Sequence, residues 1–563
     1  MFLNTKPRRR WSALSALLIL QLILIVLFVS LTRADGLTVG LFLNTERAFD
    51  GYTLFTPVRE GNAYLIDNAG RVVHSWDKGT RGNQTPYLLE DGSVIRVNRG
   101  ITQHAWDGSL VWDFVYDGPD YRGHHDIEVL PNGNVLLLAH EFKTAAEAIA
   151  EGRDPGTLNT GALVSEKIVE VRRTGPTSGE IVWEWRAWDH LIQDFDPTKD
   201  NFAVVSDHPE LIDINFGETN ISNDDSDWLH ANSVDYNPEL DQIMVSVRQF
   251  GELWIIDHST TTEEAASHSG GRSGMGGGIL YRWGNPQAYR AGGVEDQRLF
   301  LQHDVQWITP GLPGEGNLLM FNNEAGRPEG PQSSIEEIVP PVDSSGGYPL
   351  TLGEPYGPAE PVWSYSNGRE FYSSIISGVG RLPNGNTLIT SGTSGIIFEV
   401  TPDGETVWKY VNPIGRDGPL TQGDPIPTTR FGTLDIGTNQ VYRAYRYAPD
   451  YPGLAGRDLT PGAVLELPKP TPMVTNTPTV TDSPIATEPP ISSPTPVIEP
   501  GDVNADGSIS TIDAALILQF DAGLLDSLPY PLSADVNVDG DINSIDAALV
   551  LQFTAGLLGT LPA

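Results

Sequence analysis

Residues 124–141 read His124-His-Asp-Ile-Glu-Val-Leu-Pro-Asn-Gly133-Asn-Val-Leu-Leu-Leu-Ala-His140-Glu141. Two apolar runs flank a Pro-Asn-Gly-Asn turn, and this pattern predicts a β-hairpin. Histidines stand at both open ends of the hairpin. Altered copies of the stretch recur along the chain, and some of them carry histidine at the same position, so its interpretation governs that of the whole sequence.

The composition limits the possible classes of protein. A chain of 563 residues is too long for one compact core, so several domains are expected. The 59 glycines, 43 prolines and 13 tryptophans favour an all-β body of short strands. A net charge of −38 argues against nucleic acid as a partner and suits a soluble secreted protein. The absence of cysteine excludes disulfides, thiolate metal sites and cysteine nucleophiles.

The N-terminus, residues 1–34, carries an export signal. Basic residues between Lys6 and Arg10 precede an apolar run from Trp11 to Leu31. About 20 such residues can span a bilayer, whereas the core of a signal peptide usually has ~7–15. The segment therefore predicts either a long signal peptide or an uncleaved transmembrane anchor. In both cases the basic flank stays inside, and the rest of the chain is expected outside the cell or at its surface.

A short motif, an aliphatic residue followed by aromatic-x-aromatic, recurs six times, the first copy being weaker. Each copy follows a hairpin built on a Gly, Asn or Asp turn. Six such units, each with about four strands, are typical of a six-bladed β-propeller, which we expect over residues 37–467. A β-sandwich or a solenoid with similar turns is the alternative. The six copies are Val73–Trp76, Val111–Phe114, Val182–Trp185, Leu280–Trp283, Val362–Tyr365 and Val407–Tyr410. The later stretch Val441–Tyr447 is expected to close or cross the ring.

Aligning the hairpins places three histidines at one position. His125 lies eight residues before Gly133, and His230 and His303 occupy the corresponding places in the next two blades. A ring brings equivalent positions of its innermost strands together at one end of the central channel. A single buried histidine is more often structural, but three in one register favour a functional site. His124 is expected to point the other way along its strand.

The second strand of each hairpin returns to the same face of the ring. Its end carries His140 in blade three, Arg248 in blade four and Asn323 in blade five. Histidines, arginines and amides together suit an anionic substrate. The insertion at residues 189–227 precedes His230, so we expect it to overhang this face.

From about Leu37 to Leu467 the sequence resembles the arylsulfotransferase (ASST) propeller family. The resemblance implies a six-bladed propeller that moves a sulfuryl group from one phenol to another without a nucleotide sulfate donor. It also implies a transiently sulfated histidine, with other histidines and an arginine holding the sulfate oxygens. The residues that carry it are His124–Ile127 with Leu130–Asn134, Trp228–Ser233, Gln302–Asp304, Phe321–Arg327 and Tyr442–Tyr447.

The resemblance assigns roles to individual residues. His230, His303 and Arg327 match the holding positions. The nucleophilic histidine is expected on the second strand of the last blade, but that region, Thr390–Ile397, has none, and no histidine follows His303. By position His125 is the candidate nucleophile or acid/base; direct transfer, and a chemistry that is different or lost, are the alternatives. The candidate catalytic residues are His125, His230, His303 and Arg327, and the candidate substrate-binding residues are His140, Arg248 and Asn323.

The C-terminal part divides into a linker and a small module. Residues 468–500 are rich in Pro, Thr and Ser and predict an extended linker. Residues 501–563 contain two near-copies of a calcium loop, each followed by a helix, and resemble a type I dockerin. This resemblance implies two calcium ions and a cohesin domain of a scaffoldin or cell-surface protein as partner. The calcium ligands expected are Asp502, Asn504, Asp506, Ser508 and Asp513, and Asp535, Asn537, Asp539, Asp541 and Asp546.

Two other functions remain open. The first is a non-catalytic propeller that binds anionic or aromatic ligands. The second is a metal-dependent hydrolase or lyase acting on polysaccharide in a cellulosome-like complex, with His125, His230 and His303 as metal ligands, since three histidines and an open position suit zinc. No convincing pair of catalytic carboxylates supports glycoside cleavage.

Overall fold

The computed structural model describes residues 37–58, 60–77, 85–158, 161–217, 226–323, 330–431, 434–469, 500–504, 508–521, 525, 528, 530–538, 541–554, 558, 560 and 561. The chain divides into two compact units, residues 1–471 and 472–563. The predicted export segment at 1–34 and nearly all of the predicted linker lie outside the described residues. Within the described part, no helix is long and apolar enough to cross a membrane.

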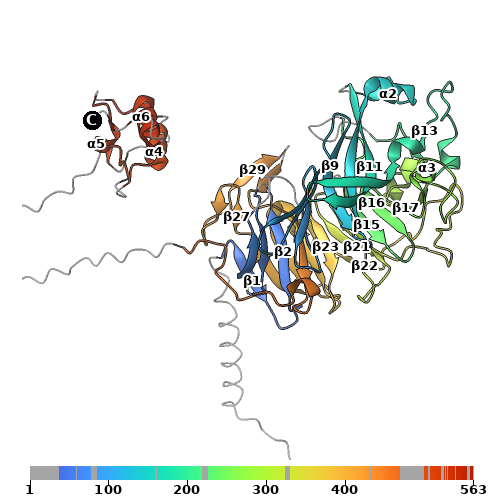
Figure 1. Ribbon diagram of the computed structural model, residues 1–563, viewed down its shortest axis with the longest axis horizontal. Helices are drawn as coiled ribbons and strands as arrows, with labels where there is room; N and C mark the ends of the chain where they lie inside the picture. Colours follow the sequence, from blue (N-terminus) through green and yellow to red (C-terminus); the bar gives the residue numbers. More distant parts are fainter. Residues whose placement is uncertain are drawn as a thin grey trace, which may run out of the picture. The chain divides into compact units, whose positions relative to one another are not determined.

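The first unit is a six-bladed β-propeller (Figure 1). Each blade is an antiparallel sheet whose strands follow one another from the centre of the ring outward. Blade one contains β31 (Val441–Tyr447), β2 (Tyr52–Pro57), β3 (Ala63–Ile66) and β4 (Val72–Trp76). Blade two contains β5 (Pro86–Leu88), β6 (Val94–Val97), β7 (Gly100–His104) and β8 (Leu110–Val115). Blade three contains β9 (Tyr121–Val129), β10 (Val135–Thr144), β11 (Ala162–Gly175) and β12 (Ser178–Arg186).

The remaining three blades follow the same order along the chain. Blade four contains β15 (Ala231–Asn237), β16 (Gln242–Val247), β17 (Glu252–Asp257) and β18 (Ile279–Trp283). Blade five contains β19 (His303–Trp307), β20 (Leu318–Asn322), β21 (Ser334–Ile338) and β22 (Trp363–Tyr365). Blade six contains β23 (Gly378–Arg381), β24 (Thr387–Ser391), β25 (Ile396–Val400), β26 (Thr406–Val411) and β1 (Gly40–Asn44). Every copy of the predicted motif falls on the fourth strand of a blade.

Both ends of the propeller segment close the ring. The late strand β31 pairs antiparallel with β2 and is the innermost strand of blade one. The first strand, β1, pairs antiparallel with β26 and adds an outer strand to blade six. The prediction that Val441–Tyr447 closes the ring is confirmed. Closure also pairs sheet edges that would otherwise expose free backbone groups.

The repeated motif holds neighbouring blades together through its tryptophans. In each copy one indole N–H donates to a backbone carbonyl in, or directly after, the turn between the third and fourth strands of the next blade. These bonds are 2.8–3.1 Å long and run around the whole ring. The pairs are Trp76 with Ala105, Trp112 with Ser178, Trp185 with Gly277, Trp283 with Pro358, Trp363 with Pro402 and Trp408 with Asn68. A buried indole N–H requires an acceptor, so the repeat encodes the contact between blades as well as the strand.

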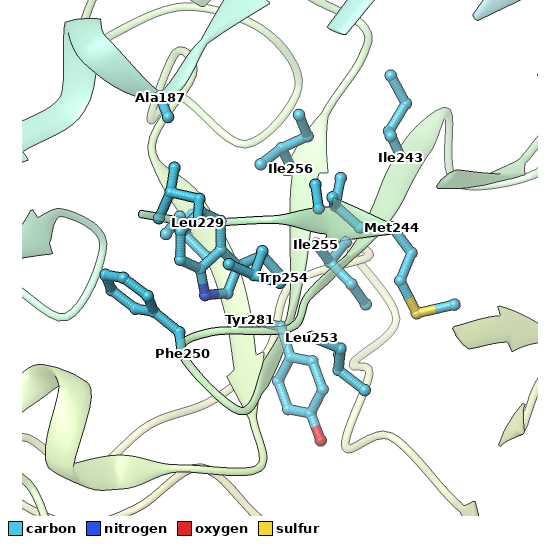
Figure 2. Packing of buried hydrophobic residues seen from close by; sticks show 14 of the residues in the cluster. Ala187, Leu229, Ile243, Met244, Phe250, Leu253, Trp254, Ile255, Ile256 and Tyr281 are labelled. Carbon is cyan, nitrogen blue, oxygen red and sulfur yellow. The ribbon is translucent and has the colours of Figure 1, made fainter. Parts of the chain in front are cut away.

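The largest apolar cluster of the propeller includes the buried hydrophobic residues of blade four (Figure 2). Leu229, Phe250, Trp254 and Tyr281 are all at most 1% exposed in this cluster. Phe250 packs edge-to-face on Trp254, with ring centroids 5.6 Å apart. Because Leu229 directly precedes His230, the cluster also fixes the backbone that presents this candidate site residue.

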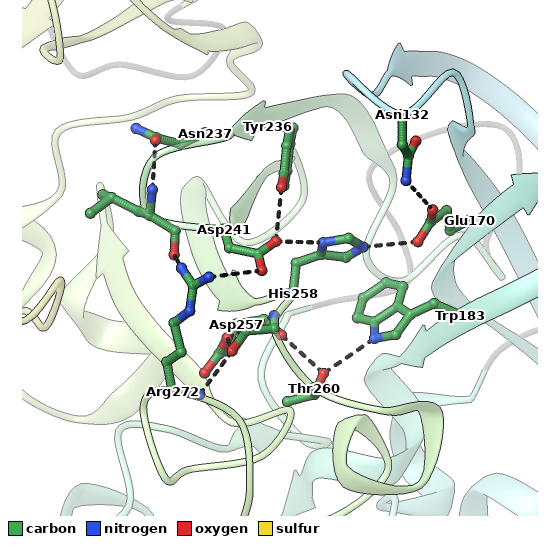
Figure 3. Close-up of polar contacts among 12 residues, drawn as sticks. Asn132, Glu170, Trp183, Tyr236, Asn237, Asp241, Asp257, His258, Thr260 and Arg272 are labelled. Atoms are coloured by element: carbon green, nitrogen blue, oxygen red, sulfur yellow. Dashed lines mark hydrogen bonds and ion pairs between the residues drawn. The ribbon is translucent and has the colours of Figure 1, made fainter.

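A polar network joins blades three and four at the edge of the cluster, where His258 packs on Trp183 (Figure 3). His258 lies between Asp241, 2.9 Å from its Nδ1, and Glu170, 3.1 Å from its Nε2. Burial lowers the pKa of His258, but its bonds to Glu170 and Asp241 outweigh this effect and raise the pKa overall. His258 is thus held between two carboxylates in a structural role, in agreement with its position outside the predicted register.

Smaller elements decorate the loops between strands. A short helix extends from the β10–β11 hairpin, and the insertion before blade four contains one parallel strand pair. They are α2 (Ala145–Ala150), β13 (Leu191–Ile192) with β14 (Ile212–Asp213), and α3 (Thr262–Ala265). Two further pairs precede the closing strand, β27 (Ile414–Gly415) with β28 (Gly418–Pro419) and β29 (Thr428–Phe431) with β30 (Leu434–Gly437).

The second unit contains three helices, α4 (Thr511–Asp521), α5 (Pro531–Ala534) and α6 (Ser544–Thr554), among its described residues. Its core is built from equivalent positions of the two sequence copies, 33 residues apart. The buried pairs are Val503 with Val536, Ala514 with Ala547, and Ile517 with Val550. The predicted twofold repeat is therefore also a repeat in the packing.

Candidate functional site

The structure brings the three register histidines together around one tyrosine. His125 lies on β9, His230 directly precedes β15, and His303 begins β19. The rings of His125 and His230 are 4.8 Å apart, centroid to centroid. Tyr442, on the closing strand β31, lies 6.2 Å from His125 and 6.4 Å from His303. Three blades and the closing strand thus supply one site at the innermost strands.

Strained backbone presents two of these histidines. His125 and His230 both have φ +50°, in the left-handed region that non-glycine residues rarely adopt. Such a conformation costs on the order of 1–3 kcal/mol and is concentrated at functional sites. The strain also explains one wrong prediction. Because His125 breaks the alternation of the strand, His124 does not point away, and its Nδ1 lies 2.5 Å from Nδ1 of His125.

Arg248 supplies a cation to this group of histidines. Its side chain is 8% exposed and makes no hydrogen bond or ion pair with any other residue that the structure describes. Its backbone N–H donates to the carbonyl of His230 at 3.3 Å, which places it beside the histidines. Burial lowers the pKa of Arg248 to about 10, so it stays charged at neutral pH. A buried guanidinium with no carboxylate partner is suited to an anionic ligand.

Asn323 determines which nitrogen of His303 carries the proton. The Asn323 amide N–H groups donate to the carbonyls of Ser373 at 2.6 Å and Ile376 at 3.0 Å. Its oxygen therefore faces Nδ1 of His303, at 2.7 Å, and accepts from it. Burial and the nearby Arg248 hold the pKa of His303 well below its usual value. His303 is neutral, with the free electron pair on Nε2.

The insertion before blade four contributes Asp227. Its Oδ2 forms a short contact with Nδ1 of His230. Burial raises the pKa of Asp227, but His230, His140 and His124 outweigh this and lower it, so the carboxylate is ionised. The expected position of the insertion near the site therefore holds for its last residues.

A buried ion-pair network supports the site from the neighbouring inner strands. Arg443 contacts Asp126 at 2.7 Å and Asp304 at 3.2 Å, and it donates to the carbonyl of Asn232 at 2.6 Å. The two carboxylates follow His125 and His303 directly in sequence, so one arginine positions two of the histidine-bearing strands. Sequence reasoning did not assign Tyr442 and Arg443 to the site. The sequence contained one signal for these two residues. They lie in Val441–Tyr447, the stretch expected to close the ring, and the strand that closes the ring is the innermost strand of blade one.

Residues at the ends of the second strands were expected to line the site, and the structure places only some of them there. His140 stacks on His124 with ring centroids 3.6 Å apart, and burial lowers its pKa to about 4. Its neighbour Glu141 instead pairs with Lys143 at 3.0 Å and with Arg186. Arg327 lies outside the described residues.

Potential metal ligands converge in two groups within the described chain. One is His124, His125 and His140; the other is His140, Glu166 and Asp227, with ligand atoms within 4.8 Å of one another in each group. The trio of His125, His230 and His303 does not form such a group among the same residues. The geometry therefore gives no support to that trio as a three-histidine zinc site.

The dockerin-like loops are closed by their twelfth residues. Asp513 is fully buried and accepts from the N–H groups of Val503 at 2.8 Å, Asn504 at 3.2 Å and Ser510 at 2.9 Å. In the second copy Asp546 is also fully buried and accepts from the N–H of Val536 at 3.0 Å.

Each of these loops begins with a carboxylate, Asp502 in the first copy and Asp535 in the second, and ends with a buried one. Asp506 and Asp539 lie outside the described residues. Carboxylate, amide and hydroxyl oxygens are the donors that calcium prefers. Residues 500–563 contain nine aspartates and no Lys, Arg or His, so the module has no cation of its own to balance the loops. The residues present fit two calcium ions.

Comparison with known proteins identifies both units. The arylsulfotransferase (ASST) family model matches residues 41–413, and the model of the dockerin type I domain matches residues 500–553. The curated arylsulfate sulfotransferase AssT of Escherichia coli is 25% identical over 329 residues, which are 53% of this chain and 50% of that protein. This chain therefore spans about half the length of the curated relative that it matches.

Solved structures resemble each unit separately. A protein of unknown function from Bacteroides caccae is 10% identical, with a TM-score of 0.37 over 70% of this chain and 98% of its own. A structure of a cohesin in complex with a dockerin from Acetivibrio cellulolyticus is 39% identical over 11% of this chain and 92% of its own, with a TM-score of 0.11. From the family match, the chain belongs to the arylsulfotransferase (ASST) family, and it carries a type I dockerin domain after the propeller.

Proposed function

We propose that the propeller transfers a sulfuryl group from an aryl sulfate to a second phenol. The observation that carries this proposal is Arg248, a buried guanidinium without a carboxylate partner among the described residues, beside three histidines in a protein of net charge −38. This arrangement favours an anion whose charge is redistributed during reaction. Membership of the arylsulfotransferase family supports the choice of a sulfuryl group.

The hydrogen-bonding pattern favours His303 over His125 as the nucleophile. Nδ1 of His303 is held by an amide oxygen whose own N–H groups are already used, so Nε2 keeps its electron pair. Nδ1 of His125 instead meets Nδ1 of His124, whose Nε2 contacts Glu166 at 2.8 Å, so the tautomer of His125 depends on the protonation of two other titratable side chains and is not fixed by an amide. His125 is then assigned to holding the sulfuryl oxygens, together with Arg248. The predicted histidine of the last blade is not needed in this scheme.

In the first step Nε2 of His303 bonds to sulfur as the bond between sulfur and the donor's phenolic oxygen breaks. The leaving phenolate takes a proton from Nε2 of His230, which enters this step as an imidazolium with its Nδ1–H held by the ionised Asp227 and leaves it neutral. In the second step the acceptor phenol returns a proton to His230 as its oxygen bonds to sulfur and the sulfur–nitrogen bond breaks. Arg248 balances the charge on the three sulfuryl oxygens in both steps. No nucleotide sulfate donor takes part.

Attachment and location belong to the same proposal. Exposed aliphatic residues occur at equivalent positions of the two dockerin helices, Ile512 (58%) with Ile545 (57%) and Leu518 (42%) with Leu551 (41%). With calcium bound, Asp502, Asn504, Asp513 and their counterparts would hold the loops, and either helix could present its face to a cohesin. The apolar segment at residues 11–31 supports export, with the propeller outside the cell or on its surface.

One assay tests the transfer. The full chain is incubated with 4-nitrophenyl sulfate, with and without phenol, and nitrophenol release and phenyl sulfate formation are followed. Release that depends on phenol is expected, and intact mass should show a sulfated enzyme when the acceptor is omitted. That adduct should persist in His125→Asn and be absent in His303→Asn. Binding of aryl sulfates without release across a donor panel would instead establish the non-catalytic alternative and overturn the proposal.

A further inference from the structure

Two buried acceptor atoms beside the proposed active site lack partners. Nε2 of His140 and Oδ1 of Asp227 have no hydrogen-bond partner in the described part of the chain. Leaving such an atom unsatisfied costs ~1–3 kcal/mol, so a folded protein rarely tolerates two of them together. The sulfuryl-transfer scheme uses neither atom. A bound cation or a hydrogen-bond donor at this place would satisfy both atoms.

The two residues surround one point together with Glu166. One ligand atom from each of His140, Glu166 and Asp227 lies within 4.8 Å of the others, and Nε2 of His140 is 3.9 Å from Oε1 of Glu166. Donors about 2.0–2.2 Å from one ion lie roughly 3–4 Å from one another. The spacing therefore suits a single ion without large movement. Three separate elements contribute, β10, β11 and the end of the insertion at residues 189–227.

The other oxygen of each carboxylate is already held by a histidine. Oε2 of Glu166 lies 2.8 Å from Nε2 of His124, and Oδ2 of Asp227 contacts Nδ1 of His230. Oε1 of Glu166 also accepts the backbone N–H of Ala231 at 2.9 Å. Such outer contacts orient metal-binding carboxylates in known sites. The donor set is thus supported as a built site rather than formed by chance at the surface.

We infer that His140, Glu166 and Asp227 bind a divalent first-row transition-metal ion of the zinc or manganese type. One imidazole and two carboxylates in a chain without cysteine favour this class, because calcium prefers oxygen donors alone and copper(I) prefers sulfur. The ion would fix Asp227, and through it the ring of His230. Metal binding itself does not rest on the proposed sulfuryl transfer, since it can be measured without any substrate.

The neighbouring histidine His258 provides the matched comparison. It contacts Glu170, which lies on β11 like Glu166, but both of its nitrogens are paired, with Glu170 and Asp241 (Figure 3). No electron pair is left over there for an ion. His258→Gln is therefore a control variant at the junction of blades three and four that should leave transition-metal binding unchanged.

The experiment uses the full chain, purified without a histidine tag, stripped with chelator and then saturated with calcium to occupy the dockerin loops. Zinc, and manganese in parallel, is titrated by calorimetry. One equivalent should bind to the wild type and to His258→Gln. His140→Gln and Asp227→Asn should each weaken that binding at least about a hundredfold, since even outer-shell changes cost roughly 10–100-fold.

A crystal of the zinc-loaded protein provides a second measurement that does not depend on variants. Its anomalous difference map should contain a peak within bonding distance of Nε2 of His140 and Oδ1 of Asp227. Absence of that peak, or equal affinity in the wild type and both site variants, overturns the inference. If the wild-type protein binds zinc at this site but transfers no sulfuryl group, only the proposed function is refuted.

Discussion

Asn323 fixes the proton of His303, because its oxygen accepts from Nδ1 of that ring at 2.7 Å while its amide N–H groups bond to two backbone carbonyls. The amide cannot flip without breaking both of those bonds. One residue on blade five thereby decides that Nε2 is the reactive nitrogen. In sequence, nothing distinguishes Asn323 from its neighbour Asn322, whose side chain bonds to Phe300 and Arg298 instead.

Replacing Asn323 with Asp tests this role. A carboxylate beside Nδ1 stabilises the protonated ring, so Nε2 is protonated and loses its electron pair at neutral pH. We expect kcat at neutral pH to fall by at least about tenfold, with little change in KM and with the acidic limb of the pH–rate profile moved to higher pH. Asn322→Asp is the matched control and should leave the profile where it is. A uniform loss of activity at every pH would contradict the assignment.

A second prediction concerns the tryptophans that join the blades. Trp408 is fully buried, and its indole N–H donates to the carbonyl of Asn68 across the junction where the ring closes. Trp408→Phe removes this bond and leaves an unsatisfied acceptor and a cavity. We expect a loss of roughly 2–3 kcal/mol in the free energy of unfolding, measured by denaturant titration.

Trp363 is the control for this prediction. It makes the equivalent bond to Pro402, at 2.8 Å, but its side chain is only half-buried. Water can replace the lost partner there, so Trp363→Phe should cost about 1 kcal/mol or less. Equal losses in the free energy of unfolding for the two variants would show that the contribution of this hydrogen bond to stability does not depend on its burial.

The repeats made the fold predictable, since each blade reuses one turn and one aromatic strand. The register of His125, His230 and His303 predicted their convergence for the same reason. The details of the site depended on local and distant geometry that repeats do not encode. The left-handed backbone at His125 turned His124 into the site. Tyr442 lies on β31, more than a hundred residues after His303 in the sequence, and only the closure of the ring brings it next to that histidine.

The His258 network predicts how stability depends on pH. Its folded-state pKa is raised above the usual value, because bonds to Glu170 and Asp241 outweigh burial. The folded protein therefore keeps a proton that the unfolded chain loses near pH 6.5. This contribution is complete below about pH 6.5 and is lost as the pH rises through the folded pKa. His258→Gln should destabilise the propeller by roughly 2 kcal/mol at about pH 6, and by less at about pH 9.

Thermal unfolding of both proteins across that pH range measures the difference. His190 is a suitable control, because it is buried and its Nε2 meets only a backbone carbonyl, that of Ala265. Burial lowers its pKa to about 4, so it is neutral across the range. The destabilisation caused by His190→Gln should not shrink as the pH rises. A His258→Gln effect that is constant with pH would refute a charged His258.

The last prediction concerns the dockerin, whose loops contain carboxylates that no cation within residues 500–563 can balance. Asp513 and Asp546 are buried in equivalent positions and tie each loop to the start of its helix. Removal of calcium should therefore unfold this unit, because the buried carboxylates then repel their neighbours without compensation.

The helical circular dichroism signal should fall on chelation and return with calcium. The melting transition of the propeller should stay unchanged, since its described core shares no residue with the dockerin core. Asp513→Ala should halve the calcium stoichiometry, whereas a helical signal that is indifferent to chelator would contradict the calcium assignment.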